Sequence, residues 1–547
     1  MNPEAQGHAQ ATKPASIGRR SMTSALGILA LTIAPLAIWL VPFLNRERIG
    51  PFYLIGRVDP AYIYLLNSLL VSCGKNPRHI DHPGTPMQII GAFVIGAMNA
   101  IDGRNPICPI QEIITRPETY LAGIFIFLQL VAAVMTALAG IWLYKLTGNI
   151  FAALILQICI VISPPIAGSF GVLGTEILVI PIILGLGLAL LPLATDSRPE
   201  RPHDSIVAGL ILGFGLATKV TVFPLLLYVF MFASTKSKVR FLAACFGSFV
   251  FWTLPIANMY KKLVTWIVNI GIHTGHYGEG SVGVPGIGAM AANARSLISE
   301  NGPAFLFACL AVVFAVWLRG RPAKLSPPAR FMLLSFSALM LQFLITVKHP
   351  AGRYMVPAIV AVAVSSGVAV AALGAIRPAF SAICFAIVLA IGVGPAASNF
   401  RYFESDLPSR YAQERSDVDK IRRIAGERCG SLIPQTNGVS AQLSGLLFGN
   451  IFAEKFDLQL AKLYPDFVSY SVGDRFYGFT GREGVNPPVD PAASRSAYSV
   501  LSNYLRRMPK NFASLRPKAN IDSTSWSEWR CAPPPGPPSR PRSGVTP

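Results

Sequence analysis

The stretch SIVAGLILGFGLATKVTVFPLLLYVFMFAS, residues 205–234, decides how the rest of the chain is arranged. A membrane-spanning helix needs about 20 apolar residues, so this stretch is long for one crossing and short for two. Basic segments flank it on both sides, with RPERPH before it and STKSKVR after it. Because Lys and Arg gather in cytoplasmic loops, a single crossing would put one basic segment on the wrong side. We therefore predict two short crossings that meet near Lys219.

The composition places the chain among polytopic membrane proteins. Its 547 residues are 52% hydrophobic and only 14% charged, and the mean hydropathy is positive. Repeated apolar runs with few charges are typical of chains that cross a membrane several times. The formal net charge is +20, but much of it lies in short loops between apolar runs, where Lys and Arg orient helices. The charge therefore predicts topology, and we expect no nucleic-acid partner.

Other apolar runs are close to the length that a spanning helix needs, although a few are short. They are Ser21–Leu44, Tyr120–Leu143, Ile150–Ile166, Thr175–Leu193, Phe241–Ile256, Pro303–Leu318, Phe331–Val347, Tyr354–Ala375 and Phe380–Ala397. With the two short crossings, they predict an all-α polytopic membrane protein with about 11 transmembrane helices. Met87–Ile101 is shorter and carries Gln88 and Asn99, so we interpret it as a helix that lies at the membrane interface.

The N-terminal segment predicts the orientation. Lys13, Arg19 and Arg20 precede the first apolar run, and no small-residue cleavage site of the A-x-A kind follows them. This pattern is typical of an uncleaved signal anchor whose start stays in the cytoplasm. An odd number of spans then puts the C-terminal segment outside. We expect a multi-pass protein of the cell (inner) membrane, with a periplasmic or extracellular C-terminal domain.

The chain is predicted to have four parts. Residues 1–20 form a cytoplasmic tail, and residues 21–397 form the transmembrane domain, with a first outer loop at 45–119. Residues 398–532 predict a small extracytoplasmic α/β domain, because LPSRYAQERSDVDKIRRIAGERC and SAQLSGLLFGNIFAEKF indicate helices, and FVSYSV and RFYGFT indicate strands. The Pro-rich end, residues 533–547, predicts a disordered tail.

The cysteines divide between the two environments of this topology. Four lie inside predicted spans, where a small buried hydrophobic side chain is the plain interpretation. These are Cys159, Cys245, Cys309 and Cys384. Cys73 and Cys108 share the first outer loop, and Cys429 and Cys531 share the C-terminal segment. Both pairs are candidate disulfides because disulfides persist outside the cytoplasm, although spacing alone does not show that the sulfurs meet.

Unusual polar residues gather on the predicted outer face. They are Arg57, Asp59, Asp81, His82, Glu176, Lys219, Trp266, His273, His276, Tyr277, Glu279, Lys348, His349, Arg353 and Tyr354. Ionisable groups at a membrane boundary are costly to desolvate, so such a collection indicates a cavity or pathway. Carboxylates accept a proton from a nucleophile or hold a metal, and Lys and Arg bind phosphate. Both sets on one face predict a lipid-phosphate substrate whose phosphate is the leaving group.

The first of these motifs resemble the C-type glycosyltransferases (GT-C), which take sugars from polyprenyl phosphates outside the membrane. That family includes protein mannosyltransferases and the transferase that adds aminoarabinose to lipid A. Asp59 in RVDPAYIYL resembles the acidic residue of the family's first outer loop. Asp81, His82 and Pro83 in HIDHPGTP resemble its acid–base–Pro motif, which lies between two interfacial helices.

Later motifs follow in the family's order. Glu176 resembles an acidic residue at the start of a later span, GLATK resembles a Gly-rich stretch ending in Lys219, and KHPAGRYMVP resembles a late turn. The resemblance covers roughly residues 20–400 and is strongest for bacterial members related to the transferases that decorate lipopolysaccharide core with galacturonic acid. Pro60 stands where protein mannosyltransferases carry a second acid, which disfavours a protein acceptor.

The resemblance implies an inverting displacement at a lipid-linked sugar. Asp59 would accept the proton of an acceptor hydroxyl as it attacks the anomeric carbon, with Asp81 and Glu176 as further catalytic carboxylates. The leaving phosphate would be bound by a group of largely basic residues. These are His82, Lys219, Lys348, Arg353 and Tyr354. A substrate loop would contain Arg57, His273, His276 and Tyr277. The implied partners are a polyprenyl-phosphate sugar, a lipid or glycan acceptor and membrane lipids.

Each motif also has a plainer interpretation. Asp59 is suited to cap the helix that follows it, and Asp81 to a polar turn. Glu176 is suited to the positive end of a helix dipole. Lys219 and Lys348 are suited to interface anchoring, because long basic side chains reach from apolar surface to water.

Three alternatives stay open. A metal site is one, since His79, Asp81, His82, His273 and His276 offer ligands suited to zinc. Nothing in their spacing fixes the distances between them, so we assign no metal ligand and leave a divalent metal open. A transporter or lipid flippase is the second, and a structural or assembly membrane protein is the third. A transporter predicts polar residues near the middle of the membrane and broken helices in two related halves.

Overall fold

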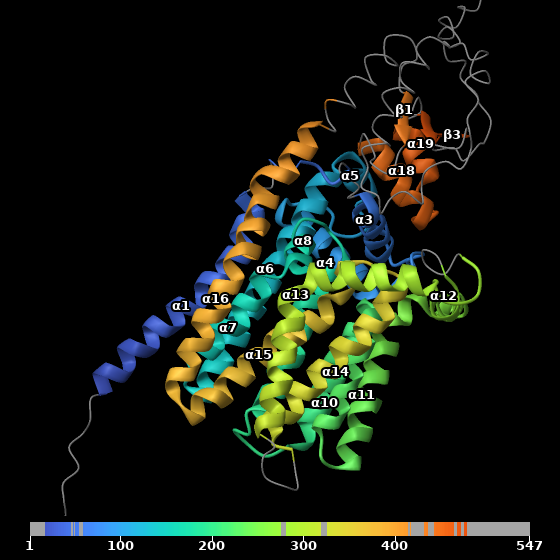
Figure 1. The fold of residues 1–547 in the computed structure, drawn as a ribbon. Coiled ribbons are helices and arrows are strands. Elements are labelled where there is room, and N and C mark those ends of the chain that lie inside the picture. Colours follow the sequence, from blue (N-terminus) through green and yellow to red (C-terminus); the bar gives the residue numbers. More distant parts are fainter. Residues whose placement is uncertain are drawn as a thin grey trace, which may run out of the picture.

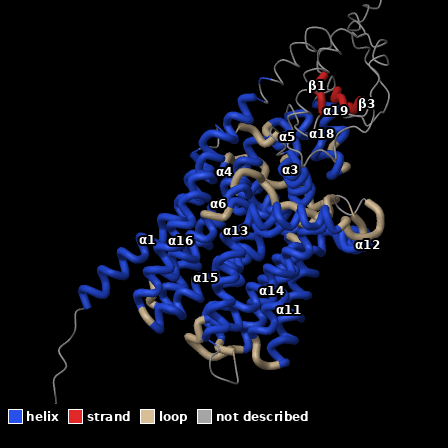
Figure 2. The backbone as a smooth tube through the Cα atoms, viewed as in Figure 1, coloured by secondary structure: helices blue, strands red, loops and turns tan. Residues whose placement is uncertain are grey.

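In the computed structural model, the chain forms a long helical bundle with smaller elements gathered at one end (Figure 1). The structure describes residues 17–44, 48, 50–53, 58–274, 280–318, 325–413, 416, 432–435, 442–463, 468–471 and 475–478. Helices make up almost all of the described chain, and its strands lie together near the C-terminal end (Figure 2).

Eleven helices of the described chain form the body of the bundle, and other elements connect them or cover one end. The body consists of α1 (Ile17–Leu44), α6 (Pro117–Thr147), α7 (Ile150–Val161), α9 (Thr175–Ala194), α10 (Pro202–Thr218), η1 (Val220–Met231), α11 (Thr235–Thr253), α13 (Ile287–Leu318), α14 (Pro327–Lys348), α15 (Val356–Ile376) and α16 (Pro378–Arg401). The shorter elements are α3 (Val58–Ser72), α4 (Thr85–Ile101), α5 (Ile110–Thr115), α8 (Pro164–Ser169), η2 (Leu254–Met259), α12 (Tyr260–Ile272) and η4 (Gly352–Met355).

Eight helices of the described chain are long and apolar enough to cross a membrane. They coincide with eight of the predicted spans, so the chain is a multi-pass helical membrane protein. The other three predicted spans are α7, α10 and η1, which have 12, 17 and 12 residues. These elements are shorter than the ~20 residues of a full crossing, so the count of about 11 transmembrane helices is not confirmed. The Met87–Ile101 segment forms α4, which is also too short to be a candidate span.

The stretch 205–234 does form two segments that meet at Lys219. Residues before it belong to α10, residues after it form the 3-10 helix η1, and Lys219 itself is extended, with φ −158°. An α-helix rises 1.5 Å per residue and a 3-10 helix about 2.0 Å, so both segments are roughly 25 Å long. The tighter winding of η1 lets 12 residues match the length of the 17-residue α10.

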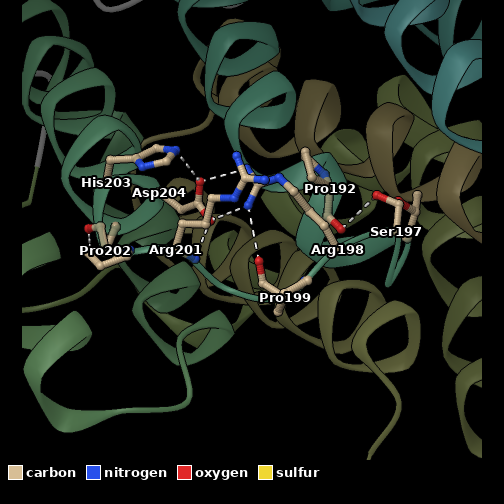
Figure 3. A network of polar contacts seen from close by, with 10 residues as sticks. Pro192, Ser197, Arg198, Pro199, Arg201, Pro202, His203 and Asp204 are labelled. Carbon is tan, nitrogen blue, oxygen red and sulfur yellow. Dashed lines mark hydrogen bonds and ion pairs between the residues drawn. The ribbon is translucent and has the colours of Figure 1, made fainter.

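A buried carboxylate closes the start of α10, far from Lys219 at the other end of that helix (Figure 3). The Arg198 guanidinium donates to both oxygens of Asp204, at 2.7 Å each. The Arg201 backbone N–H donates to the same carboxylate at 2.8 Å, and Nε2 of His203 lies 3.4 Å from it. A bidentate pair of this kind satisfies a buried charge, because each oxygen keeps hydrogen-bond donors.

Helices α10 and α11 pack closely because glycines remove side chains from their contact. A Cβ added at Gly209 would collide with the carbonyl oxygen of Phe241, and one added at Gly213 with the carbonyl oxygen of Cys245. Small residues at such contacts let helix backbones approach, which is a common arrangement in membranes.

The two innermost candidate spans are α9 and the η4–α15 segment. Their most apolar windows are 83% and 72% buried inside the protein, compared with 50% or less for the other six. Most side chains of α9 are Ile and Leu, and most of α15 are Val and Ala. Such side chains have no polar atoms to satisfy, so both helices pack at the centre. Both inner helices begin at the same end of the bundle, and that end holds the candidate site.

The disulfide predicted in the first outer loop is present. Cys73 and Cys108 are bonded across a sequence separation of 35, which ties the end of α3 to the segment before α5. The pair Cys429 and Cys531 lies outside the described residues and stays a prediction.

The cysteines of the predicted spans do not all share one environment. Cys159 and Cys245 are buried, as expected, and Cys384 is partly buried. The prediction was wrong for Cys309, which is exposed on α13. A helix at the outside of a membrane bundle presents one face to lipid, so an apolar side chain there needs no burial inside the protein.

The chain beyond the last span keeps its helical form for longer than expected. Helix α16 continues through η5 (Tyr402–Asp406) to Gln413, past the boundary that we predicted at residue 397. The expected helix in SAQLSGLLFGNIFAEKF is α18 (Gln442–Ala453), followed by α19 (Asp457–Leu463). Strands β2 (Val468–Ser471) and β3 (Arg475–Gly478) occupy the two predicted strand segments, and β2 also pairs in parallel with β1 (Leu432–Gln435). The rest of the predicted α/β domain lies outside the described residues.

Helix α18 packs directly on α3 and so joins the C-terminal segment to the first outer loop. Gly445 lies against the ring of Tyr62, and Gly449 against the Tyr62 carbonyl group, where a Cβ would be 2.5 Å from the oxygen. Two glycines one helical turn apart therefore allow α18 to lie close to the α3 backbone.

Candidate active site

The segment HIDHPGTP forms a loop that two amide side chains hold in place. Oδ1 of Asn67 accepts the backbone N–H groups of Arg78 at 2.7 Å and of His79 at 3.1 Å. Nε2 of Gln88 donates to the carbonyl oxygen of His79 at 2.9 Å. Since Asn67 and Gln88 are both buried, they fix the entry to the loop from α3 and α4. The ring of His79 packs between Tyr64 and Phe452, edge to face with each.

The second half of the loop bonds to the chain at Lys219. His82 has a φ of 86°, a left-handed conformation that is uncommon for a residue with a side chain. Its carbonyl oxygen accepts the backbone N–H of Val220 at 3.0 Å, and Pro83 forms an isolated antiparallel bridge with Lys219. The acid–base–Pro segment and the Gly-rich segment, which are distant in sequence, are therefore joined through their backbones.

An ion pair lies at the centre of the site. Nζ of Lys219 is 2.5 Å from Oε1 of Glu176, and the two side chains are only 2% and 12% exposed. Nε of Arg353 lies 3.8 Å from the same carboxylate oxygen, and its side chain is 48% exposed. The carboxylate lies in the first turn of α9, where the helix dipole also favours a negative charge. The group thus has one buried cation, one buried anion and one cation that reaches solvent.

Aromatic rings form one wall beside these charges. The Tyr354 ring has Nζ of Lys219 at 5.1 Å and Cζ of Arg353 at 5.6 Å from its centroid. The His82 ring lies at 6.4 Å from Tyr354 and at 5.6 Å from Trp266, edge to face with each. Aromatic faces attract cations, so Tyr354 holds both basic groups near Glu176.

Asp59 begins the helix beside this cluster. The structure describes its backbone at the second residue of α3 and does not describe its side chain. The next residue, Pro60, lies against Gly174, where an added Cβ would be 3.5 Å from Cγ of Pro60. Gly174 is the N-cap of α9, two residues before Glu176. The first acidic position of the sequence therefore lies at the same end of the bundle as the ion pair.

Asp81 and His82 of the loop have shifted pKa values. Burial raises the pKa of Asp81, and the nearby Lys262 ammonium opposes part of that effect. Burial also lowers the pKa of His82 well below its usual value, and the positive charge of Lys219 lowers it further, while Glu176 acts in the opposite direction. His82 is therefore neutral at pH 7, so it can donate or accept a hydrogen bond to a phosphate but does not contribute a charge there.

Two of the predicted site residues lie elsewhere. Nζ of Lys348 donates to the carbonyl oxygens of Ile270 at 3.2 Å and Gly271 at 2.6 Å, at the C-terminal end of α12. Cations stabilise helix C-termini, so in this structure Lys348 caps α12. His273 follows that helix and forms an isolated bridge with Val282. Arg57, His276 and Tyr277 lie outside the described residues.

Other polar residues reach the site without having been predicted for it. Trp266 of α12 contacts His82, and Lys262 acts on the Asp81 carboxylate. Glu300 of α13 lies against Gly352, where an added Cβ would collide with its carboxylate, next to Arg353. The Trp266 indole was noted on the outer face, whereas Lys262 and Glu300 look like ordinary surface charges in sequence. Their places depend on the fold of α12 and on the kink of α13 at Asn301.

The zinc alternative was tested against the geometry of its residues. Among the described residues, no group of three or more His, Cys, Asp or Glu side chains could hold a metal ion. Of the residues named for it, His79 is enclosed by aromatic rings and His276 lies outside the described part of the chain. A divalent-metal requirement stays untested.

The chain was compared with known proteins. No protein-family model and no curated protein matches it. Among solved structures, it is similar to ArnT from Cupriavidus metallidurans bound to undecaprenyl phosphate, with 12% identity and a TM-score of 0.45 over 82% of this chain and 90% of that one. It is also similar to the Archaeoglobus fulgidus oligosaccharyltransferase in complex with zinc and sulfate, with 11% identity and a TM-score of 0.39 over 73% of this chain and 55% of that one. Similarities at this level do not establish a function, which the site itself has to support.

Proposed function

We propose that this chain is a membrane glycosyltransferase. It transfers a sugar from a polyprenyl-phosphate donor to a hydroxyl group of a lipid or glycan acceptor, with inversion at the anomeric carbon. The reaction takes place at the end of the bundle where α9 and α15 begin. We propose that this end faces the periplasm or cell exterior, with the N-terminus in the cytoplasm.

The observation that carries the proposal is the Glu176–Lys219–Arg353 group. A buried ammonium held by a carboxylate cannot move far, so Lys219 provides a positive charge at a fixed position. A charge fixed in this way stabilises the negative charge that develops on a leaving phosphate. Arg353 is half exposed and presents planar donors that match phosphate oxygens. Glu176 positions both cations and balances part of their charge when the phosphate is absent. The side chains of the site themselves supply positive charge for a phosphate.

Asp59 supplies the proton acceptor in this proposal. The residue after it, Pro60, packs beside Gly174 at the start of the Glu176 helix. A carboxylate at this position can accept the proton of an attacking hydroxyl as a general base. Phosphate is already a good leaving group, so the reaction needs no separate general acid. Asp81 is then available to hydrogen-bond the sugar or the acceptor.

The neutral His82 and its aromatic neighbours form the wall against which the donor sugar or its phosphate lies. Tyr354 and Trp266 offer flat apolar surfaces with polar tips, which suit a sugar ring. Because His82 carries no charge at pH 7, the positive charge in the site comes from Lys219 and Arg353.

A transporter is disfavoured by the placement of the charges. Glu176 lies in the first turn of α9, Lys219 directly follows α10, and Arg353 lies in the turn before α15. All three are at helix ends, whereas transport sites lie near the membrane midplane.

The proposal is tested by donor binding and sugar transfer with the full chain in lipid nanodiscs. Arg353→Gln should weaken binding of polyprenyl phosphate by about tenfold or more, since a charged hydrogen bond to phosphate is lost. Arg377→Gln is the matched control, because Arg377 is exposed in the turn before α16. Transfer of label from a polyprenyl-phosphate sugar by the wild type would support the proposal. Equal donor binding by both variants, with no transfer from a broad donor panel, would overturn it.

A further inference from the structure

A second polar site lies at the start of the loop that continues through His79 and His82 to the Lys219 segment. It is an open cleft of about 610 Å³ between the loop after α3, the end of η2 and the turn between α18 and α19. Its polar lining consists of Lys75, Asn76, Arg78, Asn258 and Lys455. Among the residues that the structure describes, no carboxylate lines it. Clefts of several hundred cubic ångströms are large enough for the headgroup of a ligand.

The cleft keeps an excess of positive charge. Nη1 of Arg78 is 2.6 Å from Oε2 of Glu454, so this cation is balanced. Among the described residues, no carboxylate lies within 4 Å of the Lys75 or Lys455 ammonium. Two uncompensated lysines that face one cleft repel each other unless an anion lies between them.

The first wall of the cleft is held rigidly. Cys73 is bonded to Cys108 directly before Gly74, which has a φ of 65°. The Lys75 backbone N–H donates to Leu70 at 2.9 Å, and the Arg78 N–H donates to Asn67. Lys75 and Arg78 therefore project from a fixed backbone.

The opposite wall is also organised. The turn that carries Glu454 and Lys455 is closed by Asn450, whose side chain bonds Asp457 at 2.7 Å and the Phe456 N–H at 3.0 Å. Glu454 has a φ of 53°, so the turn takes a left-handed step there. A preorganised pair of walls lowers the entropy lost on binding a ligand.

The cleft and the ion pair share one loop. Residues 74–78 line the cleft, and the following residues reach His82 and the bridge between Pro83 and Lys219. Ile80, between them, is buried against Ile256 and Leu263 of the η2–α12 segment. A ligand anchored in the cleft would therefore lie next to the reacting end of a donor bound at Lys219.

Helix α12 indicates how such a ligand arrives. It begins directly after Met259, which lines the cleft, and its exposed face carries apolar side chains. These are Val264, Ile267, Val268 and Ile272. An amphipathic helix with an exposed apolar face and nearby lysines suits the boundary of a membrane with anionic headgroups.

We propose that the cleft binds the acceptor through an anionic headgroup that carries two or more phosphate or carboxylate groups. Lys75 and Lys455 bind the anionic groups, Asn76 and Asn258 bind neighbouring hydroxyls, and the acceptor hydroxyl extends past His82 toward Asp59. This assignment of the acceptor class rests on the proposed function, whereas the binding of anions by the cleft does not. Both a lipid-linked headgroup and a soluble anionic glycan have this chemistry, and the position of α12 favours the lipid.

The test measures anion binding without any sugar donor. The full chain in phosphatidylcholine nanodiscs is titrated calorimetrically with inorganic pyrophosphate and with dioctanoylglycerol pyrophosphate, which present the same anion without and with a lipid anchor. Lys75→Gln/Lys455→Gln should weaken binding of either probe about 25-fold, about fivefold for each exposed charge pair. Lys75→Arg/Lys455→Arg should retain it. Lys236→Gln, an exposed lysine on α11, is the matched control for lost charge.

Each outcome decides a separate point. Tighter binding of the lipid probe supports a lipid-linked acceptor, and equal binding supports a soluble one. Unchanged affinity in Lys75→Gln/Lys455→Gln overturns the cleft proposal, as does binding that depends on Arg353 alone, because the probe then occupies the donor site. If the cleft variants lose the anion but the wild type transfers no sugar, the anion site stands and the glycosyltransferase function fails.

Discussion

Nζ of Lys219 and Oε1 of Glu176 are 2.5 Å apart, and the bond joins the end of α10 to the start of α9 across 43 residues of sequence. With exposed fractions of 2% and 12%, both side chains are largely withdrawn from water. Burying a charge is costly unless its partner is present, so each residue depends on the other.

Removing one partner of this pair should therefore destabilise the protein strongly. Glu176→Gln or Lys219→Met alone should each cost about 3–5 kcal/mol of unfolding free energy, because each leaves a buried charge without its partner. The double variant should recover most of that loss while donor binding stays weak. Thermal unfolding of the four proteins in detergent measures the coupling. If the double variant loses the sum of the two single losses of unfolding free energy, the two residues are not energetically coupled.

Asp59→Asn should remove transfer while leaving donor binding intact. Loss of a general base slows a reaction by about 10²–10⁴-fold, and the amide keeps the size and much of the capping ability of the carboxylate. Label transfer and polyprenyl-phosphate binding are measured on the same nanodiscs. The control is Asp102→Asn, since Asp102 is an exposed carboxylate 3.4 Å from Arg104 at the end of α4. If Asp59→Asn transfers sugar at a rate close to that of the wild type, another residue is the general base.

His82 should make the folded state sensitive to acid. Its pKa is lowered on folding, through burial and Lys219, with further contributions from His79 and Arg353 and an opposing one from Glu176. The folded state therefore favours the neutral ring. This stability is fully present above the unfolded pKa of about 6.5 and is lost as the pH falls toward the folded pKa, by at most about 1.4 kcal/mol per pH unit.

His82→Gln should flatten the stability profile between pH 7.5 and pH 5. Asp81 contributes with the opposite sign, since its raised pKa favours the protonated carboxyl, and this contribution is lost as the pH rises through its folded pKa. Asp81→Asn therefore serves as the comparison, and it should not flatten the acid limb. Identical acid limbs for the wild type and His82→Gln would contradict the assignment.

Gly213→Ala should separate α10 from α11 and displace Lys219, which follows α10. The added methyl group collides with the carbonyl oxygen of Cys245, and overpacking of this kind costs about 1–3 kcal/mol. Gly247→Ala is the matched control in α11, because no atom lies within 4 Å of its added Cβ. That change should be neutral or stabilise the helix by up to about 1 kcal/mol. Thermal unfolding measures the stability of both variants. Equal stabilities would show that Gly213 is not needed for the close contact between α10 and α11.

Loss of the Cys73–Cys108 disulfide should loosen the first outer loop. A bond that closes a loop of 35 residues contributes about 4 kcal/mol in the chain-entropy description. Cys73→Ala/Cys108→Ala should lower the unfolding temperature and make it independent of reductant, whereas the wild type loses stability when reduced. If the unfolding temperature of the wild type does not change after verified reduction, the packing of α18 on α3 is sufficient to hold the first outer loop.

Sequence alone determined the parts of this protein that depend on local chemistry. Apolar runs of near-spanning length predicted eight helices that the structure contains, because burial of a helix in lipid needs only composition and length. The basic segments around residues 205–234 correctly predicted a break at Lys219, since charge bias acts on short loops. The same reasoning brought Asp81, Glu176 and Arg353 to one end of the bundle.

Tertiary structure decided which charges meet. Lys219 and Lys348 were equivalent candidates in sequence, but one pairs with Glu176 and the other caps α12. Such contacts depend on angstrom-scale positions that only the packing of whole helices sets. The short 3-10 helix η1 and the cleft built from three separate segments were likewise invisible, because sequence patterns report a residue's own surroundings and not the distant side chains that complete a site.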